Sequence, residues 1–158
     1  MARCPGDTVS VRRPPFGEWP WIVAALALAV VAELGLRTAG LPRLARMFGT
    51  PLRTDDSTPA QPDHPSGAPV LDDRARRQVR SSRRVMRHWP FGDTCLRQAL
   101  ISGALLRRLG PELLVGVAKI DGQVRAHAWL EINGGILDPL GAAASYTPLL
   151  SPDALDVK

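Results

Sequence analysis

The pattern of apolar residues changes at Leu113, and this change constrains the fold more than any other feature. Before it, apolar side chains recur with helical spacing, whereas from Leu113 to Asp138 they follow the alternation of strands. Asp121-Gly122 and Asn133-Gly134 interrupt the alternating region, and such dipeptides favour two-residue hairpin turns. The sequence therefore predicts an α+β fold in which a helix packs on a small antiparallel meander of three strands.

The two turns fix which side chains of this meander are neighbours. With Asn133-Gly134 as a two-residue turn, counting along both strands puts His127 and Asp138 on one face as diagonal neighbours. A carboxylate in that position accepts a hydrogen bond from an imidazole and sets its tautomer. The first turn places Gly116 opposite His127, and we expect this glycine to leave the ring room to turn.

Cys95 is the candidate nucleophile. It follows Asp93 and Thr94, which are good N-cap residues, and it opens a helix predicted to run to Gly110. The positive end of a helix stabilises a thiolate. If this helix packs its N-terminus on the face that carries His127, then nucleophile, base and orienting carboxylate form a triad. A cysteine, a histidine or an aspartate alone is more often structural, and their order on helix, strand and strand favours the triad.

Composition divides the chain into four segments. Residues 1–18 are rich in proline and arginine and are predicted to be mobile, and residues 19–49 form an N-terminal helical region. Residues 50–71 carry many Pro, Asp and Ser residues and are predicted to be a flexible linker. Residues 72–158 then form the domain that carries the candidate triad.

The cysteines and histidines give no sign of a metal or cofactor site. Cys4 and Cys95 are the two cysteines, and they belong neither to a paired framework nor to a Cys/His cluster. We therefore predict no cofactor and no metal. A reducing cytoplasm is the simplest compartment for two free thiols.

The most apolar stretch of the chain lies between residues 19 and 36. Its uninterrupted part is shorter than the roughly 20 residues that cross a bilayer, and Glu33 and Arg37 form an i,i+4 pair near its end. We favour a helix that is buried or faces a partner. Attachment to a membrane surface is a less favoured alternative, and a signal or anchor the least.

A dense set of arginines follows the linker. The chain has a formal charge of +5 and a pI of about 10.2, and one predicted helix face carries Arg74, Arg76, Arg77, Arg80, Arg83, Arg84 and Arg87. This face is either solvated or a docking surface for an acidic peptide or protein. Nucleic acid is not an expected partner, because no base-reading motif and no interleaved aromatic residues accompany the arginines.

Three motifs occur in the order TCLRQALISGALLRRLG, LLVGVAKI and AHAWLEINGGILD, within about residues 85–140. Together they resemble the transglutaminase-like leader peptidases of lasso-peptide biosynthesis. The AHAWLE segment is also similar to the histidine motif of transglutaminase-core proteins in general. The resemblance implies a papain/transglutaminase-like fold and a catalytic triad of Cys95, His127 and Asp138.

The same resemblance implies a cysteine peptidase that removes the leader from a ribosomally synthesised precursor peptide. Its implied partners are the leader peptide, a separate leader-recognition protein and a macrolactam synthetase. Two alternatives remain open. One is a transglutaminase-type acyl transferase with the same triad, and the other is a non-catalytic scaffold subunit of the biosynthetic complex.

Overall fold

The computed structural model describes residues 15–53, 67–92, 94–138 and 141–149. Its helices are α1 (Trp19–Thr38), α2 (Leu41–Met47), α3 (Asp73–Arg87) and α4 (Cys95–Leu105). Its strands are β1 (Glu112–Ile120), β2 (Gln123–Ile132), β3 (Gly135–Leu137) and β4 (Thr147–Pro148). Short 3₁₀ turns are η1 (Phe16–Glu18), η2 (Arg107–Leu109) and η3 (Ala143–Ser145).

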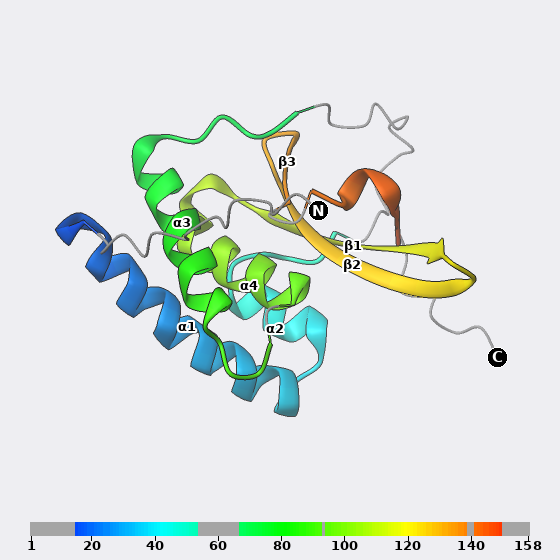
Figure 1. Ribbon diagram of the computed structural model, residues 1–158, viewed down its shortest axis with the longest axis horizontal. Coiled ribbons are helices and arrows are strands. Elements are labelled where there is room, and N and C mark those ends of the chain that lie inside the picture. The colour runs from blue at the N-terminus through cyan, green and yellow to red at the C-terminus, as the bar shows by residue number, and fades with distance from the viewer. Residues whose placement is uncertain (1–14, 54–66, 93, 139–140, 150–158) are drawn as a thin grey trace, which may run out of the picture.

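The four strands form one antiparallel sheet in the order β3-β2-β1-β4. The α-helices lie on one side of this sheet, and η3 lies on the other (Figure 1). The predicted α+β arrangement is therefore confirmed. The sequence did not predict β4. This strand pairs with Gly116 and Val117 in the middle of β1.

Both predicted hairpin turns are present. Asp121 and Gly122 have φ values of 50° and 78°, and Asn133 and Gly134 have values of 49° and 76°. Two successive residues in the left-handed region give the turn whose twist matches that of paired strands. The register follows: Ile132 pairs with Gly135 in the second hairpin, and Gly116 pairs with His127 in the first.

The two faces of β2 meet different neighbours, because side chains alternate along a strand. Ala128 and Leu130 belong to the core cluster that α4 completes with Ala99 and Leu100. Trp129 belongs to a second cluster on the η3 side of the sheet. His127 is two residues from Trp129, so both side chains lie on the same face of β2. The predicted base therefore lies on the face that the α-helices do not cover.

The N-terminal helices share this core. Ala32 of α1 and Leu44 of α2 belong to the same cluster as Leu130, so the boundary predicted at residue 72 does not separate two cores. Within the predicted linker, Leu52 makes an isolated bridge to Leu113, and residues 54–66 lie outside the described residues. Of the N-terminal segment predicted to be mobile, residues 16–18 form η1, and residues 1–14 are likewise not described.

Gly103 lets Thr50, the first residue of the predicted linker, approach α4 closely. A Cβ atom at this position would collide with the methyl group of buried Thr50 and would lie 3.4 Å from Leu130 Cδ2. A glycine inside a helix is otherwise unfavourable, and this close contact accounts for it.

We predict that Gly103→Ala lowers the free energy of unfolding by about 1–3 kcal/mol, because the collision outweighs the gain of about 1 kcal/mol in helix propensity. Thr50→Ser removes the colliding methyl group and keeps the hydroxyl that donates to Ala45 O over 3.2 Å. The double variant should therefore recover most of the loss in urea unfolding. Strictly additive effects of the two substitutions would contradict this packing.

Candidate active site

His127 and Asp138 form a buried hydrogen-bonded pair. The distance from His127 Nε2 to Asp138 Oδ2 is 3.0 Å, and the two side chains are only 5% and 4% exposed. The pair joins β2 to the residue that directly follows β3, which is the diagonal relation derived from the hairpin register. The structure thus brings together two of the three residues of the predicted triad.

A tight turn holds the carboxylate of Asp138 in place. Its Oδ2 atom accepts hydrogen bonds from the backbone N–H groups of Ala142 and Ala143, at 2.6 and 2.7 Å. The backbone carbonyl of Asp138 also accepts from the N–H of Gly141, whose φ of 67° suits a glycine. Sequence reasoning missed this turn, although Asp138, Pro139 and Gly141 occupy the positions where aspartate, proline and glycine are typical of a β-turn.

These bonds assign the roles of the two imidazole nitrogens. An ionised carboxylate only accepts hydrogen bonds, so His127 Nε2 must donate its proton to Asp138. In the neutral ring the other nitrogen, Nδ1, then carries the free lone pair. Nδ1 is therefore the atom that can take a proton from a nucleophile.

Two aromatic rings pack against the imidazole of His127. The Trp129 ring is stacked at a centroid distance of 5.9 Å, and the Tyr146 ring is tilted at 5.0 Å. Gly116, expected to leave room for the imidazole, instead leaves room for Trp129: a Cβ there would lie 2.7 Å from Trp129 Cη2. Our interpretation of Gly116 was therefore wrong: the glycine makes room for the Trp129 indole, which in turn stacks on His127.

Cys95 is the first residue of α4 and is half-buried. The Thr94 side chain caps the helix by accepting from the N–H of Arg97 at 3.4 Å, so the predicted N-cap residue is confirmed. Asp93, the other N-cap candidate, is outside the described part of the chain. The nucleophile candidate therefore lies at the positive end of an 11-residue helix.

Ideal helix and strand geometry places Cys95 at about the same level of the fold as His127. Gly103 of α4 meets Leu130 of β2, and α4 and β2 run in the same direction, since Leu106 meets Ile132. Cys95 precedes Gly103 by eight residues, or about 12 Å along the helix. His127 precedes Leu130 by three residues, or about 10 Å along the strand.

The helix nevertheless packs on the face of β2 opposite to the one expected. Cys95 packs against the cluster of Ala128, whereas the His127 ring points to the η3 side, and no hydrogen bond joins the two among the described residues. The predicted triad was conditional on α4 packing its N-terminus on the His127 face, and the described contacts place α4 on the other face. β3 pairs only with residues 130–132, so among the described residues no β3 residue pairs with β2 at His127.

An ion-pair network fixes the N-terminal turn of α4. Arg97 donates from Nε to Glu33 of α1 at 2.9 Å, and its Nη1 atom lies 3.3 Å from the hydroxyl of the capping Thr94. Glu33 also accepts from Arg37 at 3.1 and 3.2 Å. Burial raises the pKa of Glu33, but the hydrogen bonds from Arg97 and then Arg37 outweigh it and hold this pKa below its ordinary value. Sequence reasoning found the Glu33–Arg37 pair and missed Arg97.

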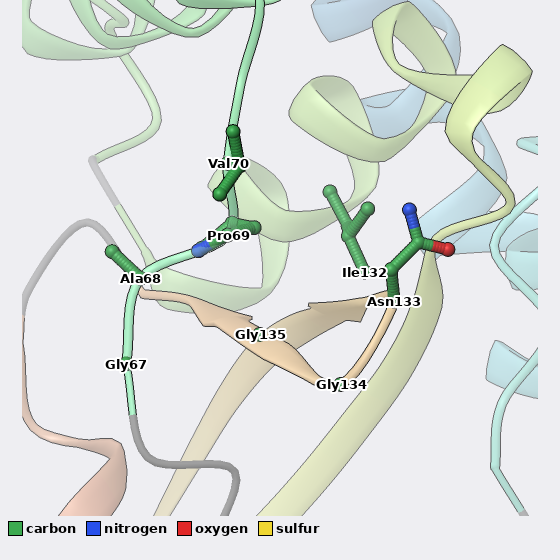
Figure 2. A pocket seen from close by; sticks show the side chains of 8 residues that line it. All are labelled: Gly67, Ala68, Pro69, Val70, Ile132, Asn133, Gly134 and Gly135. Atoms are coloured by element: carbon green, nitrogen blue, oxygen red, sulfur yellow. The ribbon is translucent and has the colours of Figure 1, made fainter.

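The other described parts of the molecule offer no comparable chemistry. A hollow of about 260 Å³ lies between residues 67–70 and 132–135 (Figure 2), and its lining contains no ionisable side chain. Trp89 packs in the cluster formed by α1, α3 and α4, which contains no residue of β2. Among the described residues, no group of three His, Cys, Asp or Glu side chains is arranged to hold a metal ion.

Comparison with known families matches residues 36–151 to the transglutaminase-like superfamily. The chain belongs to this superfamily. The match begins inside α1 and ends beyond β4, so it spans Cys95, His127 and Asp138 and all four strands. Members of the transglutaminase-like superfamily include cysteine peptidases and acyltransferases. No curated protein and no solved structure matches the chain.

We predict that Asp138→Ala changes the tautomer of His127, because the acceptor that holds the proton on Nε2 is lost. Imidazole ¹⁵N chemical shifts should show the Nε2-protonated form in the unmodified protein and a mixture in the variant. The exposed His88 provides an internal control whose shifts should not change. The variant should also unfold about 3 kcal/mol more easily, since three donors lose a buried charged acceptor. Identical His127 spectra would contradict the assignment.

Glu33 gives the fold a pH dependence with a defined sign. Since its pKa is lowered by folding, its contribution to stability is complete above the ordinary value of 4.5 and is lost as the pH falls below it. Urea unfolding at pH 6 and pH 3.5 should show a smaller loss of stability on acidification for Glu33→Gln than for the unmodified protein. Equal losses would show that the Arg97–Glu33 contact is not a linked ion pair.

Proposed function

We propose that this protein is a cysteine peptidase whose triad is Cys95, His127 and Asp138. The observation that carries the proposal is the buried Nε2–Oδ2 bond of 3.0 Å, which leaves Nδ1 as the basic atom. His127 is placed at about the level of the N-terminus of α4, which supports Cys95 as the thiol whose proton Nδ1 accepts. Membership of a superfamily that includes cysteine peptidases supports the reaction class.

The reaction would proceed through a thioester. The Cys95 thiolate attacks the carbonyl of the scissile peptide bond, with its proton held on His127 Nδ1. The backbone N–H of Cys95 has no acceptor within the helix at this first turn, so it is available to the oxyanion. The imidazolium then gives its proton to the leaving amine. Water, activated by Nδ1, releases the acyl fragment and restores the thiol.

The substrate we propose is the leader segment of a ribosomally synthesised precursor in lasso-peptide maturation. The support is the order of the three motifs quoted above and the similarity of AHAWLE and its surroundings to those leader peptidases. We further propose that a separate leader-recognition protein presents the precursor, because the described residues before α3 form helices rather than a strand-rich module. A macrolactam synthetase would use the released core, and the compartment would be the cytoplasm.

Cys95→Ala and His127→Ala should each abolish leader removal, by at least about a thousandfold in kcat, because no other described group supplies the nucleophile or the base. The assay is incubation with candidate precursor peptides and the recognition protein, followed by mass spectrometry. Cys4→Ala is the matched control and should retain full activity. Circular dichroism should be the same for all three variants.

The masses of the products separate the reaction types. Hydrolysis yields two fragments whose masses sum to that of the precursor plus one water. A single heavier species that contains an added amine would instead indicate an acyl transferase with the same triad. Processing that survives Cys95→Ala would refute the proposed peptidase.

A further inference from the structure

Helix α1 exposes a long apolar stripe to solvent. Its outward side chains recur at helical spacing from η1 to the last turn of α1, over about 27 Å, and they comprise Phe16, Trp19, Val23, Leu26, Val30, Val31 and Leu34, which are 47–95% exposed. The opposite face of α1 consists of small residues, and Ala25, Ala29 and Ala32 are at most 2% exposed against the body of the protein. An exposed apolar surface of this length indicates a docking site.

The stripe contains no exposed charge. The acidic residue near its end, Glu33, is turned inward with 8% exposure and is bound to Arg97 and Arg37. Of the described helices, α1 alone is long and apolar enough to cross a membrane, with a mean hydropathy of 1.9 over its best window. In this fold, however, its alanine face is buried against α3 and α4, so α1 lies along the surface of the protein.

Arginine side chains border the stripe on both sides. On the α3 side, Arg84 and His88 line a hollow of about 290 Å³ together with Ile22 and Leu26 of α1. On the other side, Gly35 of α1 packs on Leu44, which places α2 and its exposed residues Arg43 and Arg46 beside the C-terminal end of α1. Arg37 lies at the C-terminal end of the stripe, with its side chain 61% exposed.

We propose that this surface docks the protein on an anionic phospholipid membrane, with α1 lying in the plane of the interface. The apolar stripe enters the boundary between headgroups and acyl chains, and the arginines on both flanks contact lipid phosphates. The hollow beside Ile22 and Leu26 accommodates part of an acyl chain below Arg84 and His88.

The shape and charge of the surface favour lipid over a protein partner. The stripe lies on one convex helix, and a protein partner would need a matching groove about 27 Å long, whereas a bilayer adapts to it. An apolar face with cations on both borders is the arrangement by which amphipathic helices bind anionic membranes. Trp19 and Phe16 at one end are residues that lie readily at headgroup level.

Flotation of the full chain with vesicles tests the proposal without any peptide substrate. The protein should float with vesicles of 30% phosphatidylglycerol in phosphatidylcholine, float poorly with phosphatidylcholine alone, and be released by high salt. Val23→Glu combined with Val30→Glu should weaken flotation about tenfold or more. Val124→Glu, on a valine of the β1–β2 hairpin that is more exposed than either, is the control and should float like the unmodified protein.

A second measurement does not depend on the folding of charged variants. Phosphatidylglycerol with brominated acyl chains should quench the fluorescence of the unmodified protein, and the quenching should be smaller in Trp19→Phe. Absent flotation, equal flotation with both vesicle types, or full flotation of the double glutamate variant would overturn the proposal. A dimer or a complex with an acidic protein that the glutamates disrupt, without lipid binding, would assign the stripe to that occupant instead.

Discussion

The bond between His127 Nε2 and Asp138 Oδ2 is the interaction on which the proposed chemistry depends. It is buried, and it is anchored at the acidic end by the backbone N–H groups of Ala142 and Ala143. Because backbone donors fix the carboxylate and aromatic rings hold the imidazole, neither side chain has to be ordered when a substrate arrives. A base that is already oriented lowers the entropic cost of proton transfer.

The nucleophile side of the site is organised by α1. Glu33 is buried in the body of the protein and binds Arg97, and Arg97 in turn lies against Thr94 at the start of the helix that begins with Cys95. The N-terminal helices therefore share the core that carries the candidate site, although the family match, which begins at residue 36, includes α2 and only the last turn of α1. The same helix α1 presents its other face to solvent, so one element both supports the candidate active site and forms the proposed membrane surface.

Local chemistry made the hairpins and helix starts predictable. Asp-Gly and Asn-Gly turns require left-handed backbone, which few other dipeptides adopt at low cost, and Asp72 and Thr94 cap their helices through their own side chains. The turns fixed the register, and the register gave the His127–Asp138 pairing by counting. These features depend on residues close together in sequence.

The parts that were missed depend on contacts between distant residues. β4 is two residues long and exists because β1 accepts it, so its own sequence carries no strand signal. Glu33 and Arg97 are 64 positions apart, and the sequence does not indicate which of many arginines reaches the carboxylate. The sequence also left open which face of β2 α4 covers, because Ala128, Trp129 and Leu130 are all apolar and side chains from either face could have met the helix.

Alkylation of Cys95 by iodoacetamide near pH 6 tests the central claim, that thiol, imidazole and carboxylate act as one unit, and Cys4 in the same chain provides the reference thiol. Peptide mapping by mass spectrometry gives both rates from one sample. We expect Cys95 to react at least about tenfold faster than Cys4, and His127→Ala to remove the difference, because only a thiolate reacts rapidly at that pH. Equal rates at the two cysteines, unaffected by His127→Ala, would contradict the triad.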